Sequence, residues 1–394
     1  MSKFIIVLCT LLIAMGCKGP TRDAAKGPSP ESAKDANQEM AQHTEPDIPF
    51  YLGTYTDGES LGIYQYSLSA DGMLSKTGLV AEAENPSFLA LSPDGRYLLA
   101  VNEVSNADQM GFVSSFHIGK DTLTFIDQKP TGGAHPCHVA LNSGGYVLVA
   151  NYSGGNMGLL KIEDDGKLSG LLDVQQHEGS GRHPRQEAPH AHSGWFTEDE
   201  GIISVDLGTN QLWFSEIETE SQKFKPGEPQ NFSLEPGAGP RHLTFHPQNR
   251  WIYVVNELSS SVSLLKKDPE TGTLAITQTI STLPEGSDTD NTCADIHISS
   301  DGKFLYASNR GHNSIVIYSV EPETGELELL GHEPTRGETP RNFSLSPGDR
   351  FLLVANQTTH TVVSFQRDSY SGLLTYVDQA EAPSPVCILF NPGP

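Results

Sequence analysis

Basic residues are scarce in this sequence, which has 25 Lys and Arg against 49 Asp and Glu and a net charge of −24. A chain this acidic repels the phosphate backbone of nucleic acids, and no basic cluster reverses the charge locally, so nucleic-acid binding is disfavoured. Cysteine is scarce as well, since only Cys137, Cys293 and Cys387 lie beyond the first 17 residues. This odd number excludes a complete set of disulfides, and we expect three buried free thiols.

Motifs of several common enzyme classes are missing. The sequence has no Gly-x-Ser-x-Gly elbow of a serine hydrolase, no His-Glu-x-x-His zinc site and no phosphate-binding P-loop. We therefore predict neither a metal ion nor an organic cofactor. Long apolar runs are missing after residue 15, so we expect no transmembrane helix in the body of the chain.

The first 17 residues have the pattern of an export signal. Lys3 precedes an apolar run from Phe4 to Met15, which is too short to cross a bilayer. The run leads into Gly16 and Cys17, similar to the end of a bacterial lipoprotein signal, and we predict lipidation of Cys17. Because Met15 fits that pattern poorly, a plain cleaved signal peptide stays open.

Residues 18–48 contain almost no large apolar side chains, so we expect a flexible tether between the signal and the body. The predicted protein is exported, is periplasmic or displayed at the cell surface, and contacts a membrane only through its lipid anchor at Cys17.

A repeat of roughly 50 residues runs through residues 49–394. Each copy has a short alternating apolar run, a turn, and a second apolar run that ends in Asn or Asp. These end points are Asn102, Asn151, Asp206, Asn256, Asn309 and Asn356. Two further strands follow each copy, for example at 314–320 and 327–333. Four strands in about 50 residues indicate one blade of a β-propeller.

A seventh copy is divided between the two ends of the chain. Residues 385–390 have the pattern of an innermost strand, and residues 49–55 and 62–68 supply the strands that follow it. We therefore predict an all-β fold: a seven-bladed β-propeller with four-stranded blades over 49–394, its ring closed by pairing of the N- and C-terminal strands. This closure removes exposed sheet edges.

The topology of a blade predicts where polar residues meet. Residues just before the first strand and just after the second strand lie on one face, around the central channel. The sequence places there His135, His138, His190, His192, Arg241, His242, Asp295, His297 and Arg341 before the strands, and Glu103, Tyr152, Glu257, Arg310 and Gln357 after them. Such a mixture suits acid–base chemistry and anion binding.

The repeat itself separates structural from functional candidates. The recurring Asn is expected to cap a turn. Three histidines have matching offsets, so a hydrogen bond between neighbouring blades and a role in substrate binding both stay open for His138, His242 and His297. Four residues do not recur in every blade, which favours a catalytic role for His190, Arg241, Glu257 and Arg310.

A longer connection at about 175–189 carries further candidates, because long loops often hold binding groups. Arg185 and Gln186, just ahead of His190, are expected to hold a substrate hydroxyl or carboxylate. His192 and Arg341 complete the set of predicted substrate-binding residues.

Several longer motifs carry a family resemblance, among them HPCHVALNSGGYVLVANYSGG (135–155), QEAPHAHS (186–193), GAGPRHLTFHP (237–247) and VVNEL (254–258). The chain after residue 48 resembles the lactonase family of seven-bladed propellers, which includes 6-phosphogluconolactonases of the propeller type and carboxy-muconate lactonizing enzymes. The resemblance implies lactone hydrolysis at a site of one His, two Arg and one Glu. The matching residues are His190, Arg241, Arg310 and Glu257.

Two main hypotheses follow for the function. In the first, the protein hydrolyses a small polar sugar lactone, with Arg241 and Arg310 stabilising the oxyanion, His190 taking the proton of water and Glu257 orienting the site. In the second, a non-catalytic propeller binds a sugar acid or a protein partner at the same face. A third and weaker hypothesis is a lyase or isomerase. The export signal favours an aldonolactone over a phosphorylated lactone, and the oligomeric state is left open.

Overall fold

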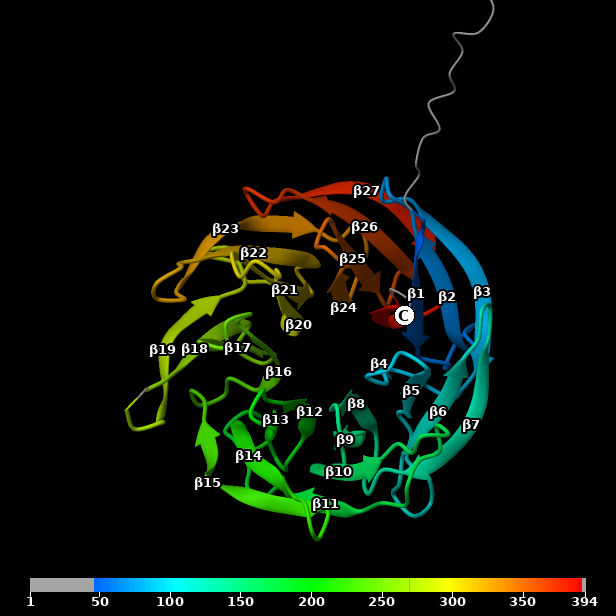
Figure 1. The fold of residues 1–394 in the computed structure, drawn as a ribbon. Coiled ribbons are helices and arrows are strands. Elements are labelled where there is room, and N and C mark those ends of the chain that lie inside the picture. The colour runs from blue at the N-terminus through cyan, green and yellow to red at the C-terminus, as the bar shows by residue number, and fades with distance from the viewer. Residues whose placement is uncertain (1–45, 269, 392–394) are drawn as a thin grey trace, which may run out of the picture. The chain divides into compact units, whose positions relative to one another are not determined.

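The computed structural model describes residues 46–268 and 270–391. These residues contain no helix, and hence none that could cross a membrane. They form seven antiparallel four-stranded sheets arranged as blades around one axis (Figure 1). This confirms the predicted all-β, seven-bladed architecture. The predicted signal, Cys17 and nearly all of the predicted tether lie outside the described residues.

Blades 1 to 3 follow each other along the chain, and in each the first strand is innermost. Blade 1 contains β4 (Leu89–Leu91), β5 (Tyr97–Asn102), β6 (Phe112–Ile118) and β7 (Leu123–Pro130). Blade 2 contains β8 (Pro136–Leu141), β9 (Tyr146–Asn151), β10 (Asn156–Lys161) and β11 (Asp173–Gln176). Blade 3 contains β12 (Ala191–Phe196), β13 (Gly201–Asp206), β14 (Gln211–Glu218) and β15 (Lys223–Ser233).

Blades 4 to 6 continue the same order. Blade 4 contains β16 (Pro240–Phe245), β17 (Trp251–Asn256), β18 (Ser261–Lys267) and β19 (Leu274–Ser281). Blade 5 contains β20 (Thr292–Ile298), β21 (Phe304–Arg310), β22 (Ser314–Val320) and β23 (Leu327–Pro334). Blade 6 contains β24 (Pro340–Leu345), β25 (Phe351–Asn356), β26 (Thr361–Arg367) and β27 (Leu374–Glu381).

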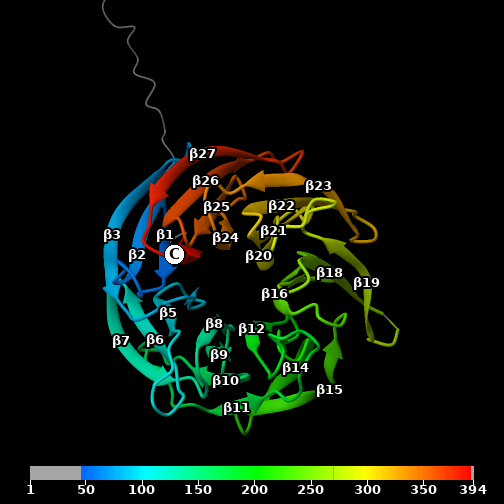
Figure 2. The same cartoon turned by 180° about the vertical axis from the view of Figure 1, so that it is seen from behind.

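Blade 7 joins the two ends of the described chain. It contains β28 (Pro385–Phe390), β1 (Ile48–Thr54), β2 (Gly62–Leu68) and β3 (Leu74–Glu82), in this order from the axis outward. β28 pairs antiparallel with β1, with Phe50 opposite Phe390 and Leu52 opposite Ile388. The two strands lie side by side in both views (Figures 1 and 2). The predicted closure of the ring is therefore confirmed.

The apolar core lies between the blades. Alternation along each strand gives every sheet two faces, and seven clusters of buried apolar side chains each combine residues from two adjacent blades. Each blade thus buries both of its faces against its neighbours, which accounts for the strands in which nearly every residue is buried. Removing one blade would expose two such interfaces.

Hydrogen bonds from buried tyrosines add to the contacts between blades. Tyr253 of blade 4 donates from its hydroxyl to the carbonyl oxygen of Gly325 in blade 5, at 2.8 Å. Gly325 has φ of +70°, and a Cβ there would lie 2.3 Å from the Trp251 ring. Glycine is required at this turn by both its backbone conformation and its close approach to the neighbouring blade.

The recurring Asn has the structural role expected from the sequence. The side-chain amide of Asn151 donates to the carbonyl oxygen of Thr131, in the connection just before the same blade. The corresponding residues Asn102, Asn309 and Asn356 donate to Glu84, Thr282 and Thr335 in the same way. Each of these four Asn side chains therefore fixes the connection that leads into the first strand of its blade.

Candidate active site

A β-bulge near the start of the first strand recurs around the ring and turns one side chain out of the regular alternation. In blade 2, a register shift between Pro136 and His138 leaves Cys137 without a partner on β9. Shifts at matching places put three more residues at this bulge position, namely His192, Arg241 and Arg341. A thiol, an imidazole and two guanidinium groups are thereby brought to the face where the first strands begin.

The residue that leaves the second strand of each blade lies on the same face, because the first and second strands are antiparallel. These exit positions are Tyr55, Glu103, Tyr152, Leu207, Glu257, Arg310 and Gln357. Two of the seven are carboxylates, Glu103 of blade 1 and Glu257 of blade 4, and these blades lie on different sides of the ring (Figure 1).

Glu257 forms ion pairs with three arginines. Its Oε2 atom lies 3.1 Å from Nε of Arg241 and 3.0 Å from Nη2 of Arg310, and its Oε1 atom lies 2.7 Å from Nη2 of Arg185. The side chains of Glu257 and Arg241 are each 3% exposed, whereas that of Arg185 is 44% exposed. Arg185, from the connection between blades 2 and 3, therefore covers an ion cluster built by blades 4 and 5.

Backbone carbonyls of β20 hold the two buried guanidinium groups in place. Nη1 of Arg241 donates to the Ala294 oxygen, and Nη2 of Arg310 donates to the Cys293 oxygen at 2.9 Å. Both arginines are thus oriented before any substrate arrives, as electrostatic catalysis requires.

The charges of this cluster are fixed at neutral pH. Burial alone would raise the pKa of Glu257, but the charges of Arg310, Arg241 and Arg185 outweigh burial and lower it to about 2. Burial, joined by repulsion from Arg310 and Arg341, lowers the pKa of Arg241 to about 10. Glu257 therefore stays ionised and Arg241 stays protonated, so Glu257 organises the arginines rather than exchanging protons.

His190 is connected to this ion cluster through Tyr152, which contacts both His190 and Arg185. The two rings are stacked, with centroids 4.6 Å apart and planes inclined by 13°. Nδ1 of His190 lies 3.1 Å from the Tyr152 carbonyl oxygen, and Nε2 lies 3.2 Å from Oε1 of the exposed Glu187. The Tyr152 hydroxyl accepts a hydrogen bond of 3.3 Å from Arg185, which binds Glu257. Tyr152 thus links the imidazole to the ion cluster.

Gln186 anchors the connection that carries Arg185. Its buried amide Nε2 donates to the Leu207 oxygen at 2.7 Å and to Oδ1 of Asn210 at 3.0 Å. The structure therefore places the Gln186 side chain among backbone and loop partners rather than beside the arginines, and its contribution is to hold Arg185 in position.

Three buried imidazoles fill the space near the axis. The His242 ring lies 5.5 Å from that of His138 and 5.4 Å from that of His192, and it also contacts Phe88 of blade 1. Nδ1 of His242 lies 2.8 Å from Oδ1 of Asp295 in the next blade, which confirms the interblade hydrogen bond expected as one alternative. Burial lowers the pKa of His138 and His192 well below the ordinary value and that of His242 to about 4.

These depressed pKa values predict acid sensitivity of the fold. An unfolded histidine binds a proton below pH 6.5, whereas folded His242 does so only near pH 4, so stability is lost as pH falls from about 6.5 towards 4. Each such site contributes a slope of about 1.4 kcal/mol per pH unit. In chemical unfolding at several pH values, His192→Gln should show a shallower fall over this range than the wild type. An unchanged slope would refute the burial argument, and exposed His117→Gln is the control.

His297 does not share the offset of the other two histidines. His138 and His242 pair with Ala150 and Val255, one residue before the recurring Asn, whereas His297 pairs with Tyr306, three residues before Asn309. The expectation of matching offsets was wrong: the pairing shifts by one residue in all three blades, and His297 lies two residues further along its strand than His138 and His242 do. Asp295 takes the position of His138 and His242, and Nε2 of His297 lies 3.1 Å from Oδ2 of Asp295.

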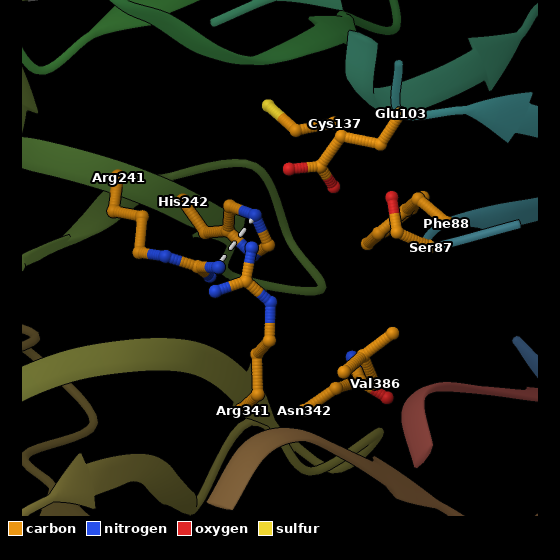
Figure 3. Close-up of a pocket in the computed structure, with 9 residues that line it drawn as sticks. All are labelled: Ser87, Phe88, Glu103, Cys137, Arg241, His242, Arg341, Asn342 and Val386. Atoms are coloured by element: carbon orange, nitrogen blue, oxygen red, sulfur yellow. Dashed lines mark hydrogen bonds between the residues drawn. The ribbon is translucent and has the colours of Figure 1, made fainter. Parts of the chain in front are cut away.

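A small pocket lies between the bulge and exit positions (Figure 3). Its lining residues are Ser87, Phe88, Glu103, Cys137, Arg241, His242, Arg341, Asn342 and Val386. The carboxylate of Glu103 and the guanidinium groups of Arg241 and Arg341 point towards its middle (Figure 3). The cavity volume is about 10 Å³, roughly the room that one water molecule needs.

Cys137, Cys293 and Cys387 are free and buried, as the sequence indicated. Although Cys137 lines the pocket, burial raises the pKa of its thiol, which therefore does not act as a nucleophile at neutral pH. Within residues 46–391, leaving out 269, no three His, Cys, Asp or Glu side chains are grouped so that they could hold a metal ion.

Sequence reasoning placed Glu103 and Tyr152 at this face but gave neither a role. It left Tyr55 out of the site altogether. The signal that links these three residues is positional, since each leaves the second strand of its blade as Glu257 does. Their contacts with Arg185, Arg341 and His190 depend on neighbouring blades and could not be read from one repeat.

The fold and the site together define a seven-bladed β-propeller with an arginine-rich site at one face of its ring. Comparison with known families shows which family of propellers this is. The family described as "Lactonase, 7-bladed beta-propeller" matches residues 49–390. The chain belongs to this family and is a lactonase enzyme. The predicted resemblance is confirmed.

Individual relatives agree with this assignment. The chain is 36% identical over 349 residues to the 6-phosphogluconolactonase of Bacillus subtilis, covering 86% of this chain and 97% of that one. It is 35% identical over 344 residues to the 6-phosphogluconolactonase of Formosa agariphila, covering 84% and 95%. The structure of a periplasmic gluconolactonase from Pseudomonas aeruginosa is similar, with a TM-score of 0.83 at 33% identity, covering 88% and 99%.

Proposed function

We propose that the protein hydrolyses a small polar sugar lactone to its acid at the arginine-rich mouth of the ring. The observation that carries this proposal is the cluster in which Arg185, Arg241 and Arg310 surround the ionised Glu257. Attack of water on a lactone carbonyl produces an oxyanion, and oriented guanidinium groups in a partly buried site stabilise that charge.

The two buried arginines supply the oxyanion site in this proposal. Each guanidinium group has five N–H donors, and Glu257 and the β20 carbonyls engage only some of them. The remaining donors of Arg241 and Arg310 are available to the carbonyl oxygen of the lactone. Arg185 is the most exposed of the three, so its side chain is the one that must move aside or bind when substrate enters.

His190 acts on the leaving oxygen in this proposal. Both of its ring nitrogens face acceptors, the Tyr152 carbonyl and the Glu187 carboxylate, and the protonated ring has an N–H group for each of them. This arrangement suits a proton donor for the ring oxygen better than the acceptor role that the sequence suggested. His190 would then protonate the alkoxide as the C–O bond of the tetrahedral intermediate breaks.

A panel of lactones, followed by acid release, tests this function. We expect the wild type to open gluconolactone-type substrates and His190→Ala to lower kcat by roughly a hundredfold, within the range for general acids. Dihydrocoumarin is the informative comparison, because its phenolate leaves without protonation. His190→Ala should slow its opening much less than that of a sugar lactone. No hydrolysis of any lactone by the wild type would overturn the proposed function.

The place of action follows from the signal pattern of residues 1–17, which lies outside the described residues. Export and lipidation at Cys17 stay predictions, of which only export is supported by the periplasmic description of the Pseudomonas aeruginosa relative. An exported enzyme would meet an unphosphorylated aldonolactone rather than 6-phosphogluconolactone. The mass of the mature N-terminal peptide distinguishes a lipidated Cys17 from a plain cleaved end.

A further inference from the structure

Glu103 faces the pocket with one carboxylate oxygen unengaged. Its Oε2 atom accepts a hydrogen bond of 2.8 Å from the Tyr55 hydroxyl. Among the described residues, no hydrogen bond or ion pair involves its Oε1 atom. The carboxylate points into the pocket, towards Arg241 and Arg341 (Figure 3). Tyr55 therefore fixes the orientation of a carboxylate whose second oxygen is free to bind a small molecule.

Glu103 differs from the other carboxylate at an exit position. Both oxygens of Glu257 face arginines, and its pKa of about 2 prevents it from taking up a proton at neutral pH. Glu103 forms no ion pair within the described part of the chain. Of the two carboxylates at exit positions, Glu103 is the one that no arginine pairs with.

The pocket beside Glu103 has the size and charge needed for an attacking water. Its volume of about 10 Å³ matches roughly one water molecule and is far too small for a sugar lactone. Arg341 lies over the Tyr55 ring, 5.3 Å from its centroid, and forms no ion pair or hydrogen bond with the described residues. A water between Glu103 and this cation would be polarised from one side and deprotonated from the other.

We propose that Glu103 is the general base of the lactonase reaction, and this inference rests on the proposed function. A water proton passes to Oε1 of Glu103 while the water oxygen bonds to the lactone carbonyl carbon. Arg241 and Arg310 stabilise the resulting oxyanion, as in the proposed function. The ring C–O bond then breaks, and His190 gives its proton to the departing oxygen. Solvent resets both groups, removing a proton from Glu103 and returning one to His190.

Glu103→Gln tests the base directly, because it keeps the shape of the side chain and an acceptor for Tyr55. We expect kcat for a sugar lactone to fall at least a hundredfold, as for loss of a general base, while KM changes only a few-fold. The acidic limb of the kcat–pH profile should disappear. Hydroxylamine attacks without a base, so hydroxamate formation should be slowed far less than hydrolysis.

Three further proteins make the test specific. Tyr55→Phe should give a smaller loss, since the carboxylate remains but its orientation is freer. Glu84→Gln, an exposed carboxylate in the connection before β4, is the matched control and should behave as the wild type. Glu103→Asp retains a base and should recover part of the rate if Glu103→Gln is destabilised.

Two results overturn the inference in different ways. If the wild type hydrolyses lactones and Glu103→Gln keeps its kcat and its acidic limb, Glu103 is not the base although the function stands. If the wild type opens no lactone while remaining folded, the proposed function fails and the inference fails with it. Equal losses of hydrolysis and hydroxamate formation would also refute a base, because they indicate a defect in binding or folding.

Discussion

Replacing Glu257 with Gln is expected to destabilise the protein and to abolish most of its lactonase activity. The change removes the counter-charge of Arg185, Arg241 and Arg310 while keeping the side-chain volume. Removing one partner of a buried ion pair typically costs about 3–5 kcal/mol, because the other charges stay buried without compensation. Chemical unfolding measures the free energy, and acid release from a sugar lactone measures the activity.

The effect of this substitution should depend on pH in a defined direction. The pKa of Glu257 is about 2 in the fold, below its ordinary value of 4.5. Its contribution to stability is therefore fully present above pH 4.5 and is lost as pH falls towards 2. The difference in unfolding free energy between the wild type and Glu257→Gln should shrink over the same interval. A difference that stays constant down to pH 2 would contradict the proposed ion cluster.

An exposed ion pair provides the control for Glu257→Gln. Lys225 and Glu216 lie on the outer strands of blade 3, and both side chains are more than half exposed. Glu216→Gln should change the unfolding free energy by less than about 1 kcal/mol, since exposed pairs are screened by water and salt. Similar losses for both variants would show that the cost at Glu257 does not come from burial.

The fold could be predicted almost completely from the sequence. The second apolar runs were expected to end at Asn102, Asn151, Asp206, Asn256 and Asn356, and strands β5, β9, β13, β17 and β25 end at these residues. The closing pair was also predicted, because residues 385–390 lack a partner strand of their own near the C-terminus. Alternation and turn residues are local signals that repeat, so errors in one copy are corrected by the others.

The candidate site was only partly predictable, because it depends on register and on contacts between blades. Arg241, Glu257 and Arg310 were identified as residues that break the repeat, and the structure brings them together. The bulges that aim the side chains shift the pairing by one residue without an evident sequence signature. His297 was misplaced for a simpler reason, since it lies two residues further past the bulge than His138 and His242 do.

Contacts made by the connection between blades 2 and 3 were equally hard to foresee. Arg185 crosses from this connection to Glu257, and Gln186 turns inwards instead of facing the site. The local sequence does not predict which blade the side chains of a long connection will contact. The stacking of Tyr152 on His190 likewise joins residues 38 positions apart.

The second large effect is expected for Arg241→Lys, which keeps the positive charge and loses the planar guanidinium group. Arg241 contacts Glu257 through Nε and the Ala294 carbonyl through Nη1, and it also lines the pocket. One ammonium group cannot make these contacts together, because it is a point charge on a flexible stem. We expect kcat to fall by roughly a hundred- to a thousandfold, the usual effect of removing an oxyanion donor.

Two comparisons separate oxyanion stabilisation from support of the fold. Arg241→Lys retains a cation beside Glu257, so its unfolding free energy should fall much less than that of Glu257→Gln. Arg336→Lys changes an exposed arginine paired with Glu333 and should alter neither activity nor stability. If Arg241→Lys lost stability as Glu257→Gln does and kept its kcat, Arg241 would be a structural partner of Glu257 alone. The oxyanion role would then fall to Arg310 and Arg341, the other guanidinium groups of the mouth.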